Sequence, residues 1–338
     1  MTNIRLSILD QSPIISGFTP AQAIQETIKL AQAAERFGYY RYWLAEHHAI
    51  AALADPCPEI LAARVAAATS TIRVGTGGVL LPYYSPFKVA EQFRMLEALY
   101  PGRIDLGIGR APGGDQMTAL AMGEGRYHGA EQFPEQVQYL VAYLDDALPA
   151  DHPFAKVKAM PAGPTAPQIW LLGSSDYGGA LAARLGLRFA FAHFISAQGG
   201  DAVMHDYRRR YEPSQREPVP QALLCVFVIC ADTAEEAERL AGSIDLRRLN
   251  TDYGVNAPVP NHEEVRNHPY TDADRRRMAF HRQRVVLGTP AAVRDKLMDL
   301  REIFQADELM AITITGDYDS RMKSYELLAE TFGLCHRG

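Results

Sequence analysis

Cysteine is scarce in this sequence. The 338 residues contain four, Cys57, Cys225, Cys230 and Cys335, and no two of them form a CxxC pair. This spacing excludes a disulfide-rich scaffold and a cysteine zinc site, and it favours a reducing compartment such as the cytoplasm. Cys225 and Cys230 share the apolar segment ALLCVFVIC, where their odd separation predicts that they point to opposite faces of a strand.

Long hydrophobic runs and blocks of one charge are also absent. The stretch MTNIRLSILDQSP carries Arg5 and Asp10 where a signal peptide needs an uninterrupted apolar core, so we expect neither a secretory signal nor a membrane span. The formal net charge of −6 is spread without a dominant block, which excludes the electrostatic footprint of a protein that binds nucleic acid or anionic membranes. We therefore expect small molecules or proteins as partners.

The sequence does contain a regular alternation of short apolar segments with amphipathic segments of helical length. Eight apolar segments are predicted strands: IRLSIL, RYWLA, IRVGTG, RIDLGIG, QIWLLG, RFAFAHF, ALLCVFVIC and MAITITG. Nine segments are predicted helices: 20–37, 58–69, 86–99, 131–148, 177–185, 201–211, 233–241, 290–304 and 320–332. Repeated strand and crossover-helix units predict a parallel (β/α)8 TIM barrel, which we assign to residues 1–338 as one domain.

A doubly wound nucleotide-binding sheet is disfavoured. The segment LDQSPIISG after the first strand has no glycine fingerprint, and in GIGRAPGG a proline, Pro112, occupies the place of the third glycine. Two segments break the even spacing of the barrel units: a glycine-rich insert at residues 113–129, and a polar, proline-containing insert at residues 245–284 between strands seven and eight. Long inserts of this kind are typical of lids.

The second insert also contains the densest positive cluster of the chain, in DADRRRMAFHRQR. The cluster predicts either a solvated helix face or a patch for an anionic cofactor or a partner protein. Its arginines are Arg275, Arg276, Arg277, Arg282 and Arg284.

The second predicted strand runs into WLAEHH, which places Glu46, His47 and His48 at the end of the barrel where TIM-barrel enzymes carry their chemistry. Adjacent histidines at a strand end point in roughly opposite directions, so we expect one to face inward and the other to be structural. The pattern suits a hydrogen-bonded pair beneath a loop, or a general base that also orients a substrate. A shared metal is disfavoured by these directions.

Two other strand ends carry small or polar residues. Residues 75–78, in VGTGG, leave room for a flat or bulky ligand to approach the backbone, or form a simple turn. Arg110, Ser174 and Ser175 combine a cation, two hydroxyls and the start of a predicted helix, which suits a phosphate. The serines equally suit an ordinary helix N-cap, and Arg110 could instead pair with Asp115.

Five segments carry a resemblance in order and spacing along almost the whole chain: LDQSP, WLAEHH, GTGGVLLPYYSPFKVAEQFRMLEALYPGRIDLGIGRAPGGD, LLGSSDYGGALAARLGLRFAFAHF and VLGTPAAVRDKL. Together they resemble the bacterial luciferase-like flavin-dependent monooxygenases, in particular the single-subunit, alkanal monooxygenase-like branch. The resemblance implies a barrel that holds reduced FMN and uses O2 to oxygenate a small organic substrate, such as an aldehyde or ketone, through a C4a-peroxyflavin.

The resemblance also assigns site residues. The active-site histidine of the family falls on His47, a base near the flavin, with Glu46 and His48 as candidate orienters. The mobile active-site loop falls on residues 245–284. The flavin contacts fall on Thr76, Gly77 and Gly78 beside the ring, where the family often has a non-proline cis peptide, and on Gly109, Arg110, Ser174 and Ser175, the last three around the phosphate. Luciferases proper have a cysteine in place of Gly109, a departure that argues against light emission.

The expected partners follow from the same resemblance. A barrel of 338 residues leaves no room for a reductase domain, so we expect a separate NAD(P)H:flavin reductase, together with the family's usual homodimer. Within the fold, the alternative is a deazaflavin (F420)-dependent oxidoreductase. From another class, the alternative is a non-catalytic flavin-binding protein, against which His47 and the long insert argue. No metal is expected.

Overall fold

A computed structural model describes residues 4–123 and 131–334. Eight parallel strands form a closed barrel, because each pairs with its neighbours and the pairing of β6 with β7 completes the ring. These strands are β1 (Arg5–Asp10), β2 (Arg41–Leu44), β3 (Arg73–Leu80), β4 (Ile104–Gly109), β5 (Gln168–Gly173), β6 (Arg188–Ala192), β7 (Ala222–Cys230) and β9 (Glu308–Ile312). The predicted TIM barrel and its eight strands are confirmed.

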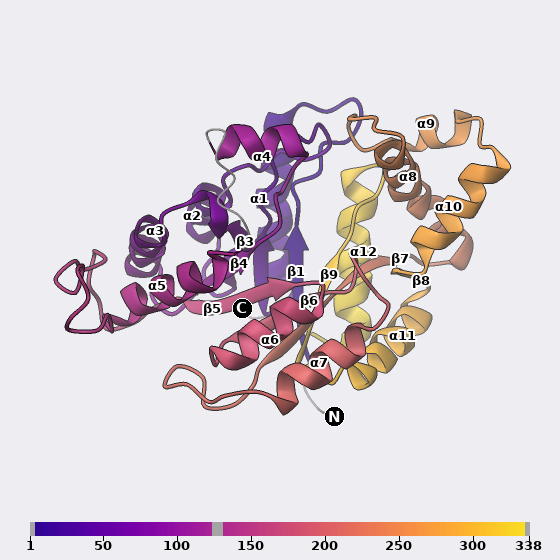
Figure 1. Ribbon diagram of the computed structural model, residues 1–338. Helices are drawn as coiled ribbons and strands as arrows, with labels where there is room; N and C mark the ends of the chain where they lie inside the picture. The colour runs from indigo at the N-terminus through magenta and orange to yellow at the C-terminus, as the bar shows by residue number, and fades with distance from the viewer. Residues whose placement is uncertain (1–3, 124–130, 335–338) are drawn as a thin grey trace.

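Helices surround the barrel, as Figure 1 shows, and all nine predicted helices are present. They are α1 (Pro20–Phe37), α2 (Pro58–Ala68), α3 (Pro86–Leu99), α5 (Phe133–Asp145), α6 (Asp176–Arg184), α7 (Gly200–Arg209), α8 (Ala234–Asp252), α11 (Pro290–Ile303) and α12 (Tyr318–Phe332). Local signals explain the accurate ends of α1: Thr19 and Gln22 form a capping box, and Gly38 ends the helix in the left-handed conformation.

Two short elements follow strand ends. A 3₁₀ turn, η1 (Leu81–Tyr83), follows β3, and α4 (Gln116–Met122) lies inside the glycine-rich insert predicted at residues 113–129. Residues 124–130 of that insert lie outside the described residues. Among the helices in the described ranges, none combines the length and the apolar composition that crossing a membrane requires.

The alternation of side chains along the strands divides the core in two. Residues such as Ile8 and Leu44 belong to a cluster packed beneath the surrounding helices. Leu9 and Trp43, each one position away, belong to a second cluster that fills the barrel interior. Cys225 lies in the interior cluster and Cys230 in the outer one, which confirms that they point to opposite faces.

The predicted insert at residues 245–284 consists mainly of helices. Asp245 is buried inside α8, where its carboxylate accepts bonds of 2.7 and 2.8 Å from Arg282. The polypeptide continues through α9 (His262–Asn267), α10 (Asp272–Arg282) and β8 (Val285–Gly288), a short ninth strand that pairs with the end of β7. The predicted start of the insert is therefore wrong, and α9 and β8 were missed. The arginine cluster lies on α10 with Arg275, Arg276 and Arg277 exposed, which agrees with the predicted solvated helix face.

The sequence also carried capping signals for the two helices of the insert, α9 and α10. Asn261 with Glu264, and Thr271 with Asp274, form complete capping boxes at the starts of α9 and α10. Both helices are short, and α9 buries none of its residues, so hydrophobic periodicity did not reveal them.

The segment after α8 returns to the barrel. Asn256 donates to the carbonyl of Ala49 at 2.9 Å and accepts from the backbone N–H of Ala51 at 2.7 Å. Val259 forms an isolated bridge with Ile15. The insert thus lies against the loops that follow β1 and β2, close in sequence to His47.

Candidate functional site

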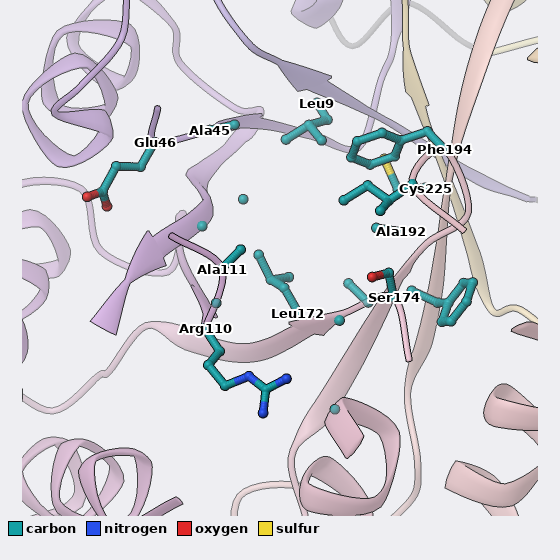
Figure 2. A pocket seen from close by; sticks show the side chains of 18 of the residues that line it. Leu9, Ala45, Glu46, Arg110, Ala111, Leu172, Ser174, Ala192, Phe194 and Cys225 are labelled. Carbon is teal, nitrogen blue, oxygen red and sulfur yellow. The ribbon is translucent and has the colours of Figure 1, made fainter. Parts of the chain in front are cut away.

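A cavity of about 270 Å³ opens at the carboxyl ends of the barrel strands. Its wall is mainly apolar and includes Leu9, Leu172, Phe194 and Cys225, which come from distant parts of the chain and surround one space in Figure 2. The predicted site residues that line the cavity are His47, Gly77, Gly78, Gly109, Arg110, Ser174 and Ser175. Folding therefore brings together seven of the eight residues that the sequence analysis selected.

Thr76 is the exception. Its side chain is fully buried, and its hydroxyl donates to the carbonyl of Gly107 at 3.0 Å. Thr76 is one residue away from Gly77, so on a strand its side chain points to the opposite face. The expected contact of its side chain with a ligand in the cavity is not supported.

Gly77 and Gly78 form a surface without side chains at the end of β3, and the peptide bond between them is cis. A Cβ atom on Gly77 would lie 2.7 Å from Leu9 and 3.0 Å from Trp43. A Cβ atom on Gly78 would lie 2.6 Å from the carbonyl oxygen of Gly107. Both positions require glycine for close packing, and the result is a flat stretch of backbone on the cavity wall.

Arg110 extends from the end of β4 and stacks on the ring of Tyr177, with its guanidinium carbon 4.1 Å from the ring centre. Within the described part of the chain it has no carboxylate partner. The alternative partner, Asp115, instead caps α4 by accepting from the backbone N–H of Thr118 at 2.7 Å. The charge of Arg110 is thus available to an anionic ligand.

Ser174 and Ser175 lie beside Arg110, between the end of β5 and the start of α6. Ser175 is the N-cap residue of α6, but its side chain makes no capping hydrogen bond. Hydroxyls, first-turn N–H groups and a nearby guanidinium are the donors that bind a phosphate. Because the hydroxyl of Ser175 does not serve as a cap, the structure favours the phosphate interpretation over the N-cap interpretation.

His47 lies on the cavity wall just after β2. Its backbone N–H donates to the carbonyl of Asp55 at 3.1 Å, and its Nδ1 lies 3.4 Å from the carbonyl oxygen of Ala45. Burial lowers the pKa of His47 to about 4, and the positive charge of Arg247 lowers it further. The imidazole is therefore neutral at pH 7. A carbonyl can only accept, so the proton belongs on Nδ1 and the lone pair of Nε2 is left as a proton acceptor.

His48 and Glu46 form a separate structural pair. The carboxylate of Glu46 accepts from His48 Nε2 at 2.8 Å, from the hydroxyl of Tyr84 at 2.6 Å and from the backbone N–H of Leu80 at 2.9 Å. Figure 2 shows this carboxylate directed away from the cavity. The expectation that one histidine faces inward and the other is structural is confirmed. The expectation that Glu46 and His48 orient His47 is wrong, because they bind each other and β3.

The sequence analysis missed two residues near the cavity. Tyr177 was visible in the segment GSSDY, because a residue in the first turn of a helix lies next to the strand end that precedes it. Arg247 carried no local signal, since only folding brings α8 close enough for its charge to affect His47.

Comparison with known proteins agrees with this geometry. A family described as "Luciferase-like monooxygenase" matches residues 4–306. "Uncharacterized protein YceB" of Bacillus subtilis (strain 168) is 47% identical over 97% of this chain and 99% of its own length. "N-acetyl-S-alkylcysteine monooxygenase" of the same strain is 36% identical over 97% of this chain and 98% of its own length. The solved structure of apo-MsnO8 has a TM-score of 0.91 at 40% identity, covering 99% of this chain and 100% of its own.

More distant structures share the fold alone. The oxygenating constituent of 3,6-diketocamphane monooxygenase of Pseudomonas putida, in complex with FMN, has a TM-score of 0.73 at 20% identity, over 97% of both chains. An F420-dependent secondary alcohol dehydrogenase has a TM-score of 0.68 at 13% identity, over 98% of this chain and 99% of its own. The choice between FMN and F420 therefore depends on the residues of this chain.

Proposed function

Since the chain belongs to the luciferase-like monooxygenase family, we propose that it uses reduced FMN and O2 to oxygenate a small organic substrate. A separate NAD(P)H:flavin reductase supplies the reduced FMN. The observation that carries this proposal is one cavity in which three features meet: a neutral imidazole, a flat glycine surface, and an arginine that has no carboxylate partner among the described residues. Aldehydes and ketones are the first substrate candidates, and thioethers are a second class because one relative is named for an S-alkylcysteine.

The residues around the cavity fit FMN. The backbone of Gly77 and Gly78 offers a flat surface for the flavin ring, where a Cβ atom would clash with the barrel interior. Arg110, Ser174 and Ser175 would hold the phosphate, since they combine a positive charge with unused hydroxyls at the start of α6. Reduced FMN, when bound, supplies the electrons that activate O2.

The protein contributes proton transfer and exclusion of water. His47 holds its proton on Nδ1 and accepts a proton at Nε2 from a group that reacts in the cavity. The apolar wall, from Leu9, Leu172 and Phe194, lowers the local dielectric and excludes water, which would otherwise compete with the substrate. Positioning and a dry cavity are the protein's part in this chemistry.

A substrate panel tests the proposal. The protein is supplied with FMN, a flavin reductase, NADH and ¹⁸O2, and alkanals, ketones and thioethers are screened by product mass. We expect a product that contains one ¹⁸O atom, and no NADH oxidation by the protein without the reductase. Oxidation or reduction that needs F420 and no O2 would favour the deazaflavin alternative. FMN binding with only hydrogen peroxide across the whole panel would favour a non-catalytic flavin-binding protein.

A further inference from the structure

One face of α8 packs against the barrel interior. Ile244 belongs to the same buried cluster as Leu9 and Trp43 of the barrel interior. One turn later, Arg248 lies over the ring of Phe227, an inward residue of β7, at 5.0 Å. Arg247 is three residues after Ile244, so it lies on this face as well.

Arg247 differs from the other arginines packed near the core. Arg41, Arg282 and Arg321 each pair with a carboxylate, and Arg248 donates to the carbonyl of His281. Within the described ranges, the guanidinium of Arg247 has neither an ion pair nor a hydrogen bond. Burial lowers its pKa to about 10, so it still carries a positive charge at pH 7. A desolvated cation without a partner is costly unless an anion joins it.

Arg247 lies near His47 and therefore near one end of the cavity. Its charge acts on His47, which lines the cavity. The chain just after α8 is fixed to the loop beyond His48 through Asn256, whose side chain bonds Ala49 and Ala51. Arg110, which also has no carboxylate partner among the described residues, lines the cavity together with Ser174 and Ser175. One phosphate is enough to pair with Arg110. Arg247 is then available to a second anionic group.

We propose that Arg247 binds a carboxylate of the organic substrate and thereby orients the substrate against His47. This inference rests on the proposed function, because it assigns a substrate to the cavity that would hold the flavin. A guanidinium presents a planar fork that matches a carboxylate in geometry and charge. The substrate class is then a small molecule with an apolar body, which the cavity wall accommodates, and a carboxylate at one end.

Binding of octanoate and of its neutral analogue octanamide tests the inference without flavin or turnover. Calorimetry on the wild-type protein should show octanoate bound at least about tenfold more tightly, as expected for a charge-assisted pair. Arg247→Met should bind the two ligands alike, whereas Arg276→Met, which removes an exposed arginine of α10, should keep the wild-type preference. Arg247→Lys keeps the charge and should retain part of the preference.

The pKa of His47, followed by NMR, gives a second measurement. Removing a nearby positive charge raises an imidazole pKa, so both Arg247→Met and octanoate bound to wild type should raise it. Equal binding of octanoate and octanamide to wild type would overturn the inference. A preference for octanoate that survives in Arg247→Met but disappears in Arg110→Ala would also overturn it. So would an Arg247→Met protein that binds reduced FMN more weakly but octanoate as before. Because these measurements need no oxygenation, they remain decisive even if the proposed monooxygenase activity is not found.

Discussion

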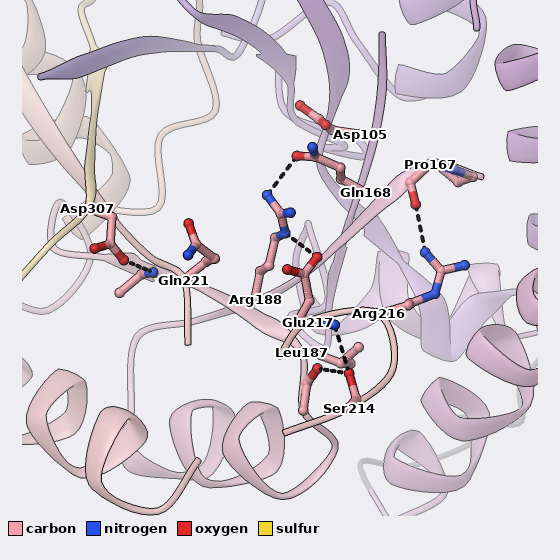
Figure 3. Close-up of polar contacts among 12 residues, drawn as sticks. Asp105, Pro167, Gln168, Leu187, Arg188, Ser214, Arg216, Glu217, Gln221 and Asp307 are labelled. Atoms are coloured by element: carbon pink, nitrogen blue, oxygen red, sulfur yellow. Dashed lines mark hydrogen bonds and ion pairs between the residues drawn. The ribbon is translucent and has the colours of Figure 1, made fainter. Parts of the chain in front are cut away.

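The two ends of the barrel differ in how their charged side chains are paired. At the amino-terminal end, Arg41 lies between Asp105 and Glu308 with contacts of 2.7 Å to each, and all three side chains are buried. Figure 3 shows the same region continuing through Arg188, which donates to Gln168 at 2.9 Å and pairs with Glu217. Every charge in this group has a partner within the protein.

At the carboxyl end, Arg110 and Arg247 have no carboxylate partner among the described residues, and His47 is held neutral. The carboxyl end also has glycines without side chains on the cavity wall, at Gly77 and Gly78. The interior of the amino-terminal end is instead filled by long side chains such as that of Arg41. The charges of the amino-terminal end are thus all paired within the protein, whereas several groups that line or adjoin the cavity at the carboxyl end have no carboxylate partner among the described residues. Stability and function are therefore separable by mutation.

The largest effect is expected at the open end, from His47→Ala. Removing a general base typically costs about 10²- to 10⁴-fold in rate, so coupled oxygenation should fall by that factor while flavin binding is retained and hydrogen peroxide is released. His48→Ala is the matched control, since His48 bonds Glu46 away from the cavity. The fall in coupled oxygenation caused by His48→Ala should be at least about tenfold smaller than the fall caused by His47→Ala. Product yield and peroxide release measure both, and equal losses would mean that neither histidine is the base.

At the closed end, Arg41→Met should lower stability. The substitution leaves Glu308 buried without its cation, which costs about 3–5 kcal/mol in the free energy of unfolding. Arg276→Met, on the exposed face of α10, should change it by less than about 0.5 kcal/mol. Urea denaturation measures both. An unchanged midpoint for Arg41→Met would contradict the contrast between the two ends.

Arg110→Ala separates the phosphate interpretation from a structural one. A charge-assisted hydrogen bond contributes roughly 1.5–3 kcal/mol, so reduced FMN should bind about 10- to 150-fold more weakly while riboflavin, which has no phosphate, binds almost as before. Titration of both flavins against both proteins measures this. A parallel loss for FMN and riboflavin would exclude Arg110 as a phosphate ligand.

Substitutions at two glycines of the cavity wall, Gly77 and Gly109, test whether the backbone of β3 is critical. Gly77→Ala places a methyl group 2.7 Å from Leu9, and such overpacking costs about 1–3 kcal/mol, which should appear as weaker flavin binding and a lower unfolding midpoint. Gly109→Ala meets no protein atom closer than Leu80 at 3.8 Å, so its unfolding midpoint should stay close to that of the wild type. Similar losses in the two variants would show that the backbone of β3 is not the critical surface.

The smallest effect concerns pH. His47 is neutral above its pKa of about 4, so kcat/KM should not change through this residue between pH 6 and pH 8, and should fall as the pH drops through about 4. An imidazole with an ordinary pKa would instead produce an inflection near pH 6.5. A pH profile of kcat/KM distinguishes the two, and Arg247→Met should move the inflection upward.

The barrel and most of the residues around its cavity were predictable from the amino-acid sequence. Apolar strands and capped amphipathic helices are local patterns, so they predicted eight strands, nine helices and the edge at which the chemistry lies. Because the carboxyl ends of parallel strands meet at one edge, His47, Gly77, Arg110 and Ser174 could be assigned to a common site before any contact was known. The adjacent positions of His47 and His48 even predicted that only one faces inward.

The contacts between side chains could not be predicted from the sequence and became visible in the folded protein. Asp245 reads as the start of a polar insert, yet it is buried because Arg282, 37 residues later, provides its partner. Glu46 lies next to His47 in sequence but bonds His48 and β3, and Thr76 lies next to Gly77 but faces away from the cavity. Arg247 became a candidate for substrate binding because α8 packs against the barrel interior and no carboxylate among the described residues pairs with this arginine. Local patterns report neighbours within a turn or two of the chain, whereas burial and charge pairing depend on segments brought together from far apart.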